Sequence, residues 1–405
     1  MPELRATDSR RVVLGLVFLL AVQAGAAPGP RRAPAIASPA GRFAASGFDT
    51  VVERGIRAGA YPGAALVIGR RDTVLFAKGY GHLTWSLASP SVDVASTLYD
   101  LASLTKVIAT TTALMLLVDR GAVRLDAPVV TYLPAFRGPG TAGITVRELL
   151  LHTSGLRPTL PLYREAADRA AALRLVYAAT PVATPGTRVI YSDLNAILLG
   201  EIVARAAGVP LDAFAEREIF APLGLAHATF HPAGRRGSDI APTGLWHGHA
   251  VAGVVNDQNA LRLGSVAGHA GLFATAVDVA RFAQFMLRQG TLPDGRRLVR
   301  AETVREFTTP ATPVSRGTGS EARALGWQGV PTGERVSSAG TAFGPRSFGH
   351  TGWTGTSLWI DPDRDLFVVL LTNRAFAPRA RRPFTVLKEV RGRIADVAAQ
   401  ASDGR

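Results

Sequence analysis

The chain has 405 residues, of which 47% are hydrophobic, and this length allows a large buried core. It contains no cysteine, so disulfides, thiolate metal sites and cysteine nucleophiles are excluded. The formal net charge is +14, but the basic residues are scattered and form no basic helix or patch with interleaved aromatics, so we expect no nucleic-acid partner. Peripheral association with an anionic cell envelope is compatible with this charge.

Residues 1–27 have the pattern of a secretory signal peptide. Three arginines precede an apolar run from Val12 to Gln23, and small residues near Ala26 offer a cleavage site. The run is shorter than the roughly 20 residues that a membrane span needs, and an uncleaved anchor is the alternative. Residues 28–42 are rich in proline, alanine and glycine, which predicts a disordered linker. We therefore expect an exported, periplasmic or extracellular protein with a single folded domain over 43–400.

The domain has β-rich segments near both of its ends. Apolar residues at helical spacing predict a first helix over 48–63. Strand-like runs over 64–69 and 73–81 flank a short polar turn, which predicts a hairpin. The segment 356–373 repeats this arrangement and ends in a continuous apolar strand. An amphipathic helix is predicted over 384–400.

The segment between the β-rich ends is mostly helical. Thr145 and Glu148 form a capping box at the start of one helix, and residues 193–208 predict another helix. This order predicts an α+β fold with an antiparallel sheet built from both ends of the domain, flanked by helices, and an active site at the seam with a helical lobe. The expected lobes are an α/β lobe over about 43–102 and 265–400 and a helical lobe over about 103–264.

Lys106 is one of only three lysines among 45 basic residues, and it lies in an apolar segment three residues after Ser103. On a helix that begins near Asp100 the two side chains share a face one turn from the N-terminus. Burial and the helix dipole both disfavour the ammonium, and a neutral amine could take the proton of Ser103 and make it a nucleophile. Arginine could not, because its guanidinium does not deprotonate in proteins. The pair alone is a weak signal, and a lysine that snorkels to the surface is the alternative.

Two further motifs carry groups that complement this pair. The Tyr191–Asp193 triplet is predicted at the junction between a short β-like run and a helix, where side chains can project into a cleft. The His350–Gly352 triplet is predicted at the start of a strand, with glycines on both sides that let a ligand approach the backbone closely. Taken singly, the tyrosine is more typical of a packed aromatic and the histidine is more typical of a strand edge.

Other candidate sites have less support. His247 and His249 are spaced like a metal pair on a strand, but no third ligand is evident, so no metal or other cofactor is predicted. His269 is expected to pack or to line the cleft. No G-x-S-x-G elbow occurs, which disfavours an α/β-hydrolase triad.

The motifs S-x-x-K, Y-S-D and H-T-G, in this order, resemble the signature of the serine β-lactamase and penicillin-binding protein superfamily. The chain is most similar to the branch of class C β-lactamases, DD-carboxypeptidases, D-amino acid peptidases and family VIII carboxylesterases, in which the middle motif begins with tyrosine. Stretches such as "ITVRELLLHTSGL" and "HTGWTGTSLWIDPDRDLFVVLLTNR" also look like that branch. The likeness covers about residues 45–380.

The resemblance implies a catalytic role for three residues. Ser103 would be the acylated nucleophile and Lys106 its base or proton relay, while Tyr191 would share the proton transfer and protonate the leaving group. An oxyanion hole would use the backbone N–H groups of Ser103 and Trp353. The residues expected to bind substrate are Asp193, His350, Thr351, Gly352 and Trp353.

Two positions depart from the pattern of the family. Asp193 stands where class C enzymes have asparagine, and a carboxylate near Lys106 would raise the pKa of the lysine against the effect of burial. His350 replaces a lysine of β-lactamases, so a fixed charge that helps hold the carboxylate of a lactam becomes a group that is neutral near pH 7.

The sequence therefore predicts an exported serine hydrolase whose substrate is an ester or a D-alanyl peptide, either a small molecule or derived from peptidoglycan. The alternatives are a β-lactamase and a catalytically silent module of the envelope that binds or senses penicillin.

Overall fold

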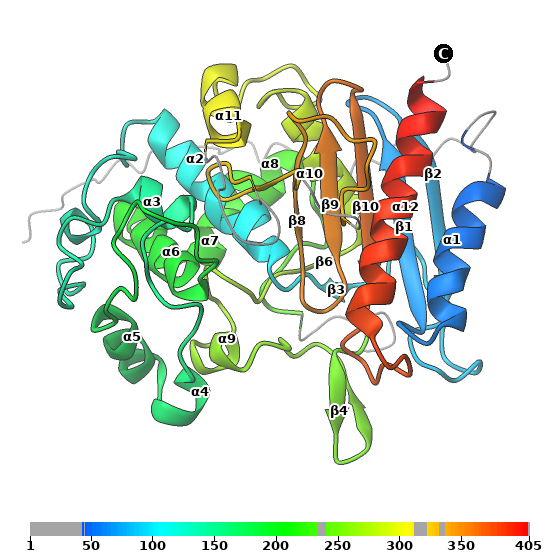
Figure 1. The fold of residues 1–405 in the computed structure, drawn as a ribbon, viewed down its shortest axis with the longest axis horizontal. Helices are drawn as coiled ribbons and strands as arrows, with labels where there is room; N and C mark the ends of the chain where they lie inside the picture. The colour runs from blue at the N-terminus through cyan, green and yellow to red at the C-terminus, as the bar shows by residue number, and fades with distance from the viewer. Residues whose placement is uncertain (1–42, 44, 233–239, 312–321, 332–336, 404–405) are drawn as a thin grey trace, which may run out of the picture. The chain divides into compact units, whose positions relative to one another are not determined.

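A six-stranded antiparallel sheet organises the structure, a computed structural model that describes residues 43, 45–232, 240–311, 322–331 and 337–403 (Figure 1). All of these residues belong to one compact unit. The predicted signal peptide and linker lie outside the described residues. In spatial order the strands are β2 (Val74–Gly81), β1 (Gly63–Gly69), β10 (Leu366–Thr372), β9 (Ser357–Asp361), β8 (Phe348–Thr351) and β7 (Gln328–Gly329).

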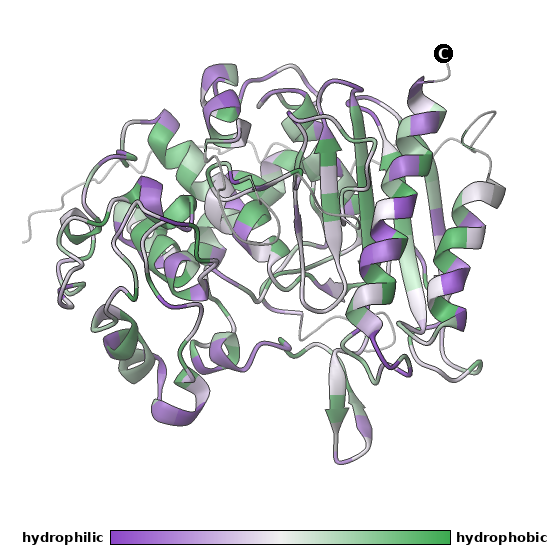
Figure 2. Cartoon of the chain, viewed as in Figure 1, coloured by the Kyte–Doolittle hydropathy of each residue, from purple (hydrophilic) through white to green (hydrophobic). Residues whose placement is uncertain are grey.

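The central strands β1 and β10 are buried along their whole lengths. Successive side chains of a strand point to opposite faces, so Val67 joins one hydrophobic core and Leu66 the other. Leu370 and Leu371 divide in the same way. A sheet covered on both faces explains why these strands are continuous apolar runs, which appear green in Figure 2.

Helices cover both faces of the sheet. α1 (Ala45–Arg57) and α12 (Pro383–Asp403) pack against each other and cover one face (Figure 1). α10 (Ala276–Leu287) packs on β1 and β10 from the other core. Helices on a mainly antiparallel sheet confirm the expected α+β class, although the division of the domain into two lobes stays a prediction.

The other elements lie mostly between β2 and α10 in the sequence. Two short pairings, β3 with β6 and β4 with β5, lie outside the main sheet. In chain order the elements are β3 (Tyr99–Asp100), the π-helix η1 (Lys106–Thr111), α2 (Thr112–Asp119), the 3₁₀-helix η2 (Val129–Thr131), α3 (Val146–Leu150), α4 (Leu162–Glu165), α5 (Arg169–Tyr177), α6 (Asp193–Ala207), α7 (Leu211–Ala215), the π-helix η3 (Glu216–Phe220), α8 (Ala221–Leu223), β4 (Gly244–Trp246), β5 (His249–Val251), α9 (Gln258–Arg262), β6 (Phe273–Ala274) and α11 (Ala301–Thr308).

The structure confirms several local predictions and corrects others. The capping box at Thr145 and Glu148 is present at the start of α3. The first helix ends at Arg57 rather than at residue 63, because Gly59 turns the chain with a φ of +75° before β1 begins. The β-like run before Tyr191 forms no strand.

The His350–Gly352 triplet also differs from its prediction. His350 is the third residue of β8 and not near a strand start, because β8 ends at Thr351. Gly352 and Gly355 belong to the connection from β8 to β9, and Gly355 has a φ of +121° that favours glycine.

The part of the chain that is described contains no single helix with the length and apolar composition of a membrane span, although α6 and the segment Leu211–Leu223, bent by 71° at their junction, satisfy both criteria as a pair.

Candidate active site

Ser103 lies in a tight turn between β3 and the helical segment that contains Lys106. The residue before it, Ala102, has a φ of +47°, in the left-handed region that residues with a Cβ seldom adopt. The N–H of Lys106 donates to the carbonyl of Ser103 at 3.1 Å, so the serine stands one turn before the lysine. The turn thus brings both side chains to the same end of the helical segment, as the spacing predicted.

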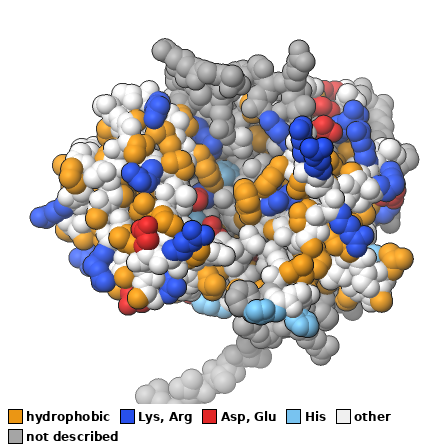
Figure 3. Space-filling view, turned by 60° about the horizontal axis from the view of Figure 1, so that its bottom comes forward, with side chains coloured by type: hydrophobic (Ala, Val, Ile, Leu, Met, Phe, Trp, Pro, Cys, Tyr) orange, Lys and Arg blue, Asp and Glu red, His pale blue; other side chains and the backbone are white. Residues whose placement is uncertain are grey.

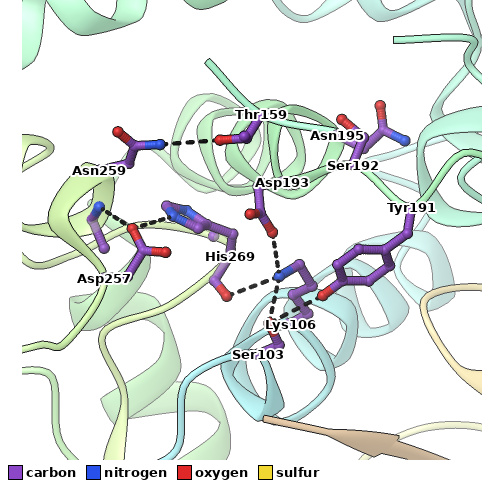
Figure 4. A network of polar contacts seen from close by, with 12 residues as sticks. Ser103, Lys106, Thr159, Tyr191, Ser192, Asp193, Asn195, Asp257, Asn259 and His269 are labelled. Atoms are coloured by element: carbon purple, nitrogen blue, oxygen red, sulfur yellow. Dashed lines mark hydrogen bonds and ion pairs between the residues drawn. The ribbon is translucent and has the colours of Figure 1, made fainter. Parts of the chain in front are cut away.

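Lys106 joins three parts of the site through its Nζ (Figure 4). The ammonium donates to Ser103 Oγ at 2.9 Å and to the carbonyl of His269 at 3.1 Å. It also forms an ion pair of 2.8 Å with Asp193 Oδ1, and the lysine side chain is 4% exposed. Its three N–H groups are therefore directed by three different segments of the chain.

The charge state of Lys106 is set by two opposing effects. Burial alone would lower its pKa, but the attraction of Asp193 and the negative charge available on Tyr191 outweigh burial and raise the pKa above its usual range. Lys106 is therefore an ammonium at neutral pH. A neutral lysine base does not fit this arrangement, and the physical reason is the carboxylate that stands where class C enzymes have asparagine.

Tyr191 is the second group that contacts Ser103. Its hydroxyl donates to Ser103 Oγ at 3.0 Å. Lys106 Nζ lies 5.0 Å from the centre of its ring, and Arg323 Cζ lies 5.2 Å from the same centre. The tyrosine therefore lies close to two cations, one of which, Arg323, was not singled out from the sequence.

Two buried histidines also pack against Tyr191. The ring of His152 lies 4.7 Å from the tyrosine ring, and the ring of His350 lies 5.9 Å from it. His152 Nδ1 accepts from the backbone N–H of Ser192 at 3.2 Å, which ties the histidine to the residue after the tyrosine. His350 Nδ1 donates to the carbonyl of Thr351 at 2.9 Å.

Both histidines are uncharged at neutral pH. Burial, then Arg323 and then Lys106 lower the pKa of His350 to about 3. Burial and the same two cations hold the pKa of His152 well below its usual range. Arg323 therefore contributes to the lowered pKa of both histidines.

The connection from β8 to β9 packs against the turn that contains Ser103. Thr354 Oγ1 donates to the carbonyl of Asp100 at 2.7 Å, and Thr356 Oγ1 donates to the carbonyl of Leu101 at 2.9 Å. At Gly352 a Cβ would lie 2.5 Å from the carbonyl oxygen of Leu101, so only glycine permits this approach. The backbone expected to supply the second oxyanion donor is thus held beside Ser103.

The remaining predicted positions lie farther from the serine contacts. Thr351 is the last residue of β8 and is partly exposed. The indole of Trp353 is 61% exposed and packs against the ring of Phe384 at 4.7 Å. Arg374 lies over both rings and donates to the carbonyl of Trp353. Direct contacts therefore unite Ser103 with Lys106 and Tyr191, and Lys106 with Asp193.

Sequence reasoning missed Arg323 and the role of His152. His152 belongs to the stretch "LLLHTSGL", but its contact with Tyr191 is long-range and has no local signature. Arg323 precedes β7 in a segment without clear periodicity, so no signal distinguished it from the other arginines. His269 is buried, and its carbonyl binds Lys106, which agrees with the expectation that it packs or lines the cleft.

Figure 3 shows one face of the molecule with a hollow that hydrophobic side chains border and with acidic and histidine side chains inside it. His247 and His249 belong to the β4–β5 hairpin, and among the residues that the structure describes no group of three His, Asp or Glu side chains could hold a metal ion.

Comparison with known proteins assigns the family. The profile of the beta-lactamase family matches residues 48–390. A protein of Escherichia coli O157:H7, named provisionally as a D-alanyl-D-alanine carboxypeptidase, is 34% identical over 371 residues, which cover 82% of this chain and 83% of that protein. Its counterpart in E. coli strain K12 is 34% identical over 358 residues and covers 79% and 80%.

Solved structures show the same fold. EstCE1, a hydrolase with promiscuous acyltransferase activity, superposes with a TM-score of 0.70 at 22% identity, over 88% of this chain and 98% of that one. A penicillin-binding protein homologue from Caulobacter crescentus gives 0.69 at 21% identity over 89% and 99%. A class C β-lactamase gives 0.66 at 20% identity over 85% and 94%. The chain belongs to the beta-lactamase family and is a serine hydrolase of the β-lactamase and penicillin-binding protein superfamily.

Proposed function

We propose that this protein is an exported carboxypeptidase that removes the last residue of D-alanyl-D-alanine peptides through an acyl-enzyme on Ser103. The relatives at 34% identity carry the name of this activity. The observation that carries the proposal is the position of Arg323, which lies beside Tyr191 and whose potential reaches His350.

Arg323 supplies a positive charge near the position where His350 replaces the lysine of β-lactamases. A D-alanyl peptide ends in a carboxylate, and His350 is neutral where β-lactamases have lysine. The Arg323 side chain is 3% exposed, so its charge acts through a medium of low polarity and is screened little by water. A fixed cation near the nucleophile favours a substrate that carries a negative charge over a neutral ester.

The contacts around Ser103 favour Tyr191 as the group that takes its proton. Oγ has hydrogen bonds to Lys106 and Tyr191, and the proton must leave through one of them. An ammonium has no lone pair, so Lys106 cannot accept the proton. Tyr191 accepts it when its oxygen is deprotonated, and the two cations near the ring stabilise the negative charge on that oxygen.

The same groups complete both half-reactions. Ser103 Oγ forms an ester bond with the carbonyl carbon of the scissile amide, and Tyr191 passes the proton to the nitrogen of the departing D-alanine. Water then attacks the ester, gives its proton to Tyr191, and the proton returns to Ser103 as the acid is released. The N–H groups of Ser103 and Trp353 would bind the oxyanion in both steps.

A matched pair of substrates tests the proposal. We expect a peptide ending in D-Ala-D-Ala to have a higher kcat/KM than the same peptide with an amidated C-terminus, than a short-chain p-nitrophenyl ester and than nitrocefin. Arg323→Gln should lower kcat/KM for the free acid about ten- to a hundredfold, since an interaction with a charged group is worth roughly 1.5–3 kcal/mol, and should change ester hydrolysis little.

The control is Arg120→Gln, which removes an arginine that is paired with Glu218. A free acid and an amide that react equally well would contradict carboxylate recognition. Fast ester hydrolysis without peptide turnover would assign an esterase, and fast nitrocefin hydrolysis would assign a β-lactamase. Acylation by penicillin without turnover of any substrate would assign a sensing module.

Export suits this substrate class, because peptidoglycan stems lie outside the cytoplasm. A net charge of +14 would favour peripheral association with an anionic envelope.

A further inference from the structure

The side chain of Asp100 holds the turn that contains Ala102 and Ser103, called the nucleophile turn below. The residue is 2% exposed and ends β3, three positions before Ser103. Its Oδ1 accepts the backbone N–H of Ala102 at 2.8 Å, and its Oδ2 accepts the backbone N–H of Asn256 at 2.7 Å. One buried carboxylate therefore joins the turn to a segment more than 150 residues away.

The segment that Asp100 binds also supports the lysine. Asp257, next to Asn256, accepts from His269 Nε2 at 3.2 Å, and the carbonyl of His269 accepts from Lys106 Nζ at 3.1 Å. Asp257 also caps α9 by accepting the N–H of Ala260 at 2.8 Å. The Asn256–Asp257 pair thus contacts the nucleophile side and the lysine side of the site.

The turn needs such support because of the conformation of Ala102. A φ of +47° is disfavoured for a residue with a Cβ and persists only where surrounding contacts impose it. The N–H of Leu101 is fixed by the carbonyl of Leu272 at 2.9 Å, and the N–H of Ala102 is fixed by Asp100. The carboxylate thus fixes the peptide plane before the strained torsion of Ala102, and the N–H of Thr105, which donates to the carbonyl of Ala102 at 2.9 Å, fixes the plane after it.

We propose that the ionised side chain of Asp100 is a positioning residue that keeps the strained turn, and with it Ser103 and its N–H, in the geometry for acylation. This inference rests on the proposed role of Ser103 as the nucleophile. A protonated Asp100 has one oxygen that is a donor, so it cannot accept both N–H groups equally well. Protonation would release one of the two contacts and slow the acylation of Ser103.

The surroundings place this change in an accessible pH range. Burial raises the pKa of Asp100 to about 6, against the hydrogen bonds from Asn256 and Ala102 that lower it, and Asp257 raises it further. Asp257 itself is paired with His269 and lies in the field of Lys106. The other elements packed here present uncharged groups, which are Phe273, Ala274, Thr354 and Thr356. Acylation should therefore slow as the pH falls through about 6.

The test is the rate at which a fluorophosphonate labels the full-length protein from pH 5 to pH 8, with the labelled residue mapped by mass and the fold checked by circular dichroism. We expect the wild-type rate to fall about tenfold for each pH unit below 6. Asp100→Asn should remove this acid limb and label at least tenfold more slowly at pH 8. With a D-alanyl peptide as substrate, the Asp100→Asn variant should have a lower kcat than the wild type and a KM within about twofold of the wild-type value.

The matched control is Asp361→Asn. Asp361 is also fully buried and accepts the backbone N–H groups of Asp363 and Arg364, but in the β9–β10 turn. It should keep the wild-type acid limb. A flat wild-type profile, or an acid limb that persists in Asp100→Asn, would overturn the inference. If Asp100→Asn does not fold, the wild-type profile alone decides, and failure to label Ser103 at any pH would instead contradict the proposed function.

Discussion

Lys106 Nζ and Asp193 Oδ1 form a 2.8 Å ion pair within the site, and the lysine side chain is almost fully buried. The pair joins the S-x-x-K motif to the first residue of α6. It keeps the lysine charged, and it also places a negative charge near the serine. A site with asparagine at position 193 would differ in both respects. Its lysine would still be buried, but no carboxylate would stabilise the ammonium form.

Replacing that carboxylate changes the charge of the site by one unit. Asp193→Asn should raise the ratio of kcat/KM for a D-alanyl peptide to that for a p-nitrophenyl ester by about tenfold, because it removes a negative charge that repels the carboxylate of the peptide. The pKa of Lys106 should fall, because burial would no longer be outweighed by Asp193.

Steady-state kinetics on the two substrates give this ratio. Asp72→Asn is the control, because the Asp72 side chain is 70% exposed and is paired with Arg288. An unchanged ratio in Asp193→Asn would mean that the carboxylate does not act on the charge of the substrate.

Removing the hydroxyl of Tyr191 tests whether Tyr191 or Lys106 accepts the proton of Ser103. Tyr191→Phe should lower kcat by about 10²–10⁴, the usual contribution of general acid–base catalysis, and leave KM near the wild-type value. The aromatic packing on His152 and His350 stays, so the melting temperature should change little.

The control for this variant is Tyr132→Phe, which removes a tyrosine hydroxyl outside the site. That hydroxyl accepts the backbone N–H of Arg124. A loss of less than tenfold in Tyr191→Phe would show that another group takes the proton of Ser103.

The neutral state of His350 predicts a dependence of stability on pH. Its pKa is about 3 in the folded protein and about 6.5 when unfolded, so below pH 6.5 only the unfolded chain takes up this proton. The residue therefore contributes a loss of about 1.4 kcal/mol of unfolding free energy for each pH unit between 6 and 4. His350→Gln should reduce the slope of stability against pH by that amount.

Urea unfolding at pH 6, 5 and 4 measures the slope. His231→Gln, at an exposed histidine, is the control for the loss of an imidazole. Parallel slopes for the wild type and His350→Gln would show that His350 is protonated in the folded protein as readily as in the unfolded chain.

The hairpins of the sheet were predictable because their signals are local. Apolar runs on both sides of short polar turns identified β1 with β2 and β9 with β10, and burial on both faces accounts for their unbroken apolar sequence. Likewise, the spacing of Ser103 and Lys106 correctly placed both groups at one end of a helical segment.

The errors occurred where distant contacts decide the structure. The strand predicted to begin at His350 instead ends at Thr351, and Gly352 lies in the connection after β8, where it packs on the turn that contains Ser103. The effect of Asp193 on Lys106 was predicted from the departure at position 193, but the positive charge beside Tyr191 comes from Arg323, which was not predicted. No local pattern selects that arginine from the others.

Trapping the acyl-enzyme tests the central claim most directly. The protein is mixed with a D-alanyl peptide or benzylpenicillin, quenched in acid within seconds, and digested for peptide mapping by mass. We predict one acyl adduct per chain, on Ser103, and its absence in Ser103→Ala. An adduct on any other residue, or substrate turnover that persists in Ser103→Ala, would contradict the account.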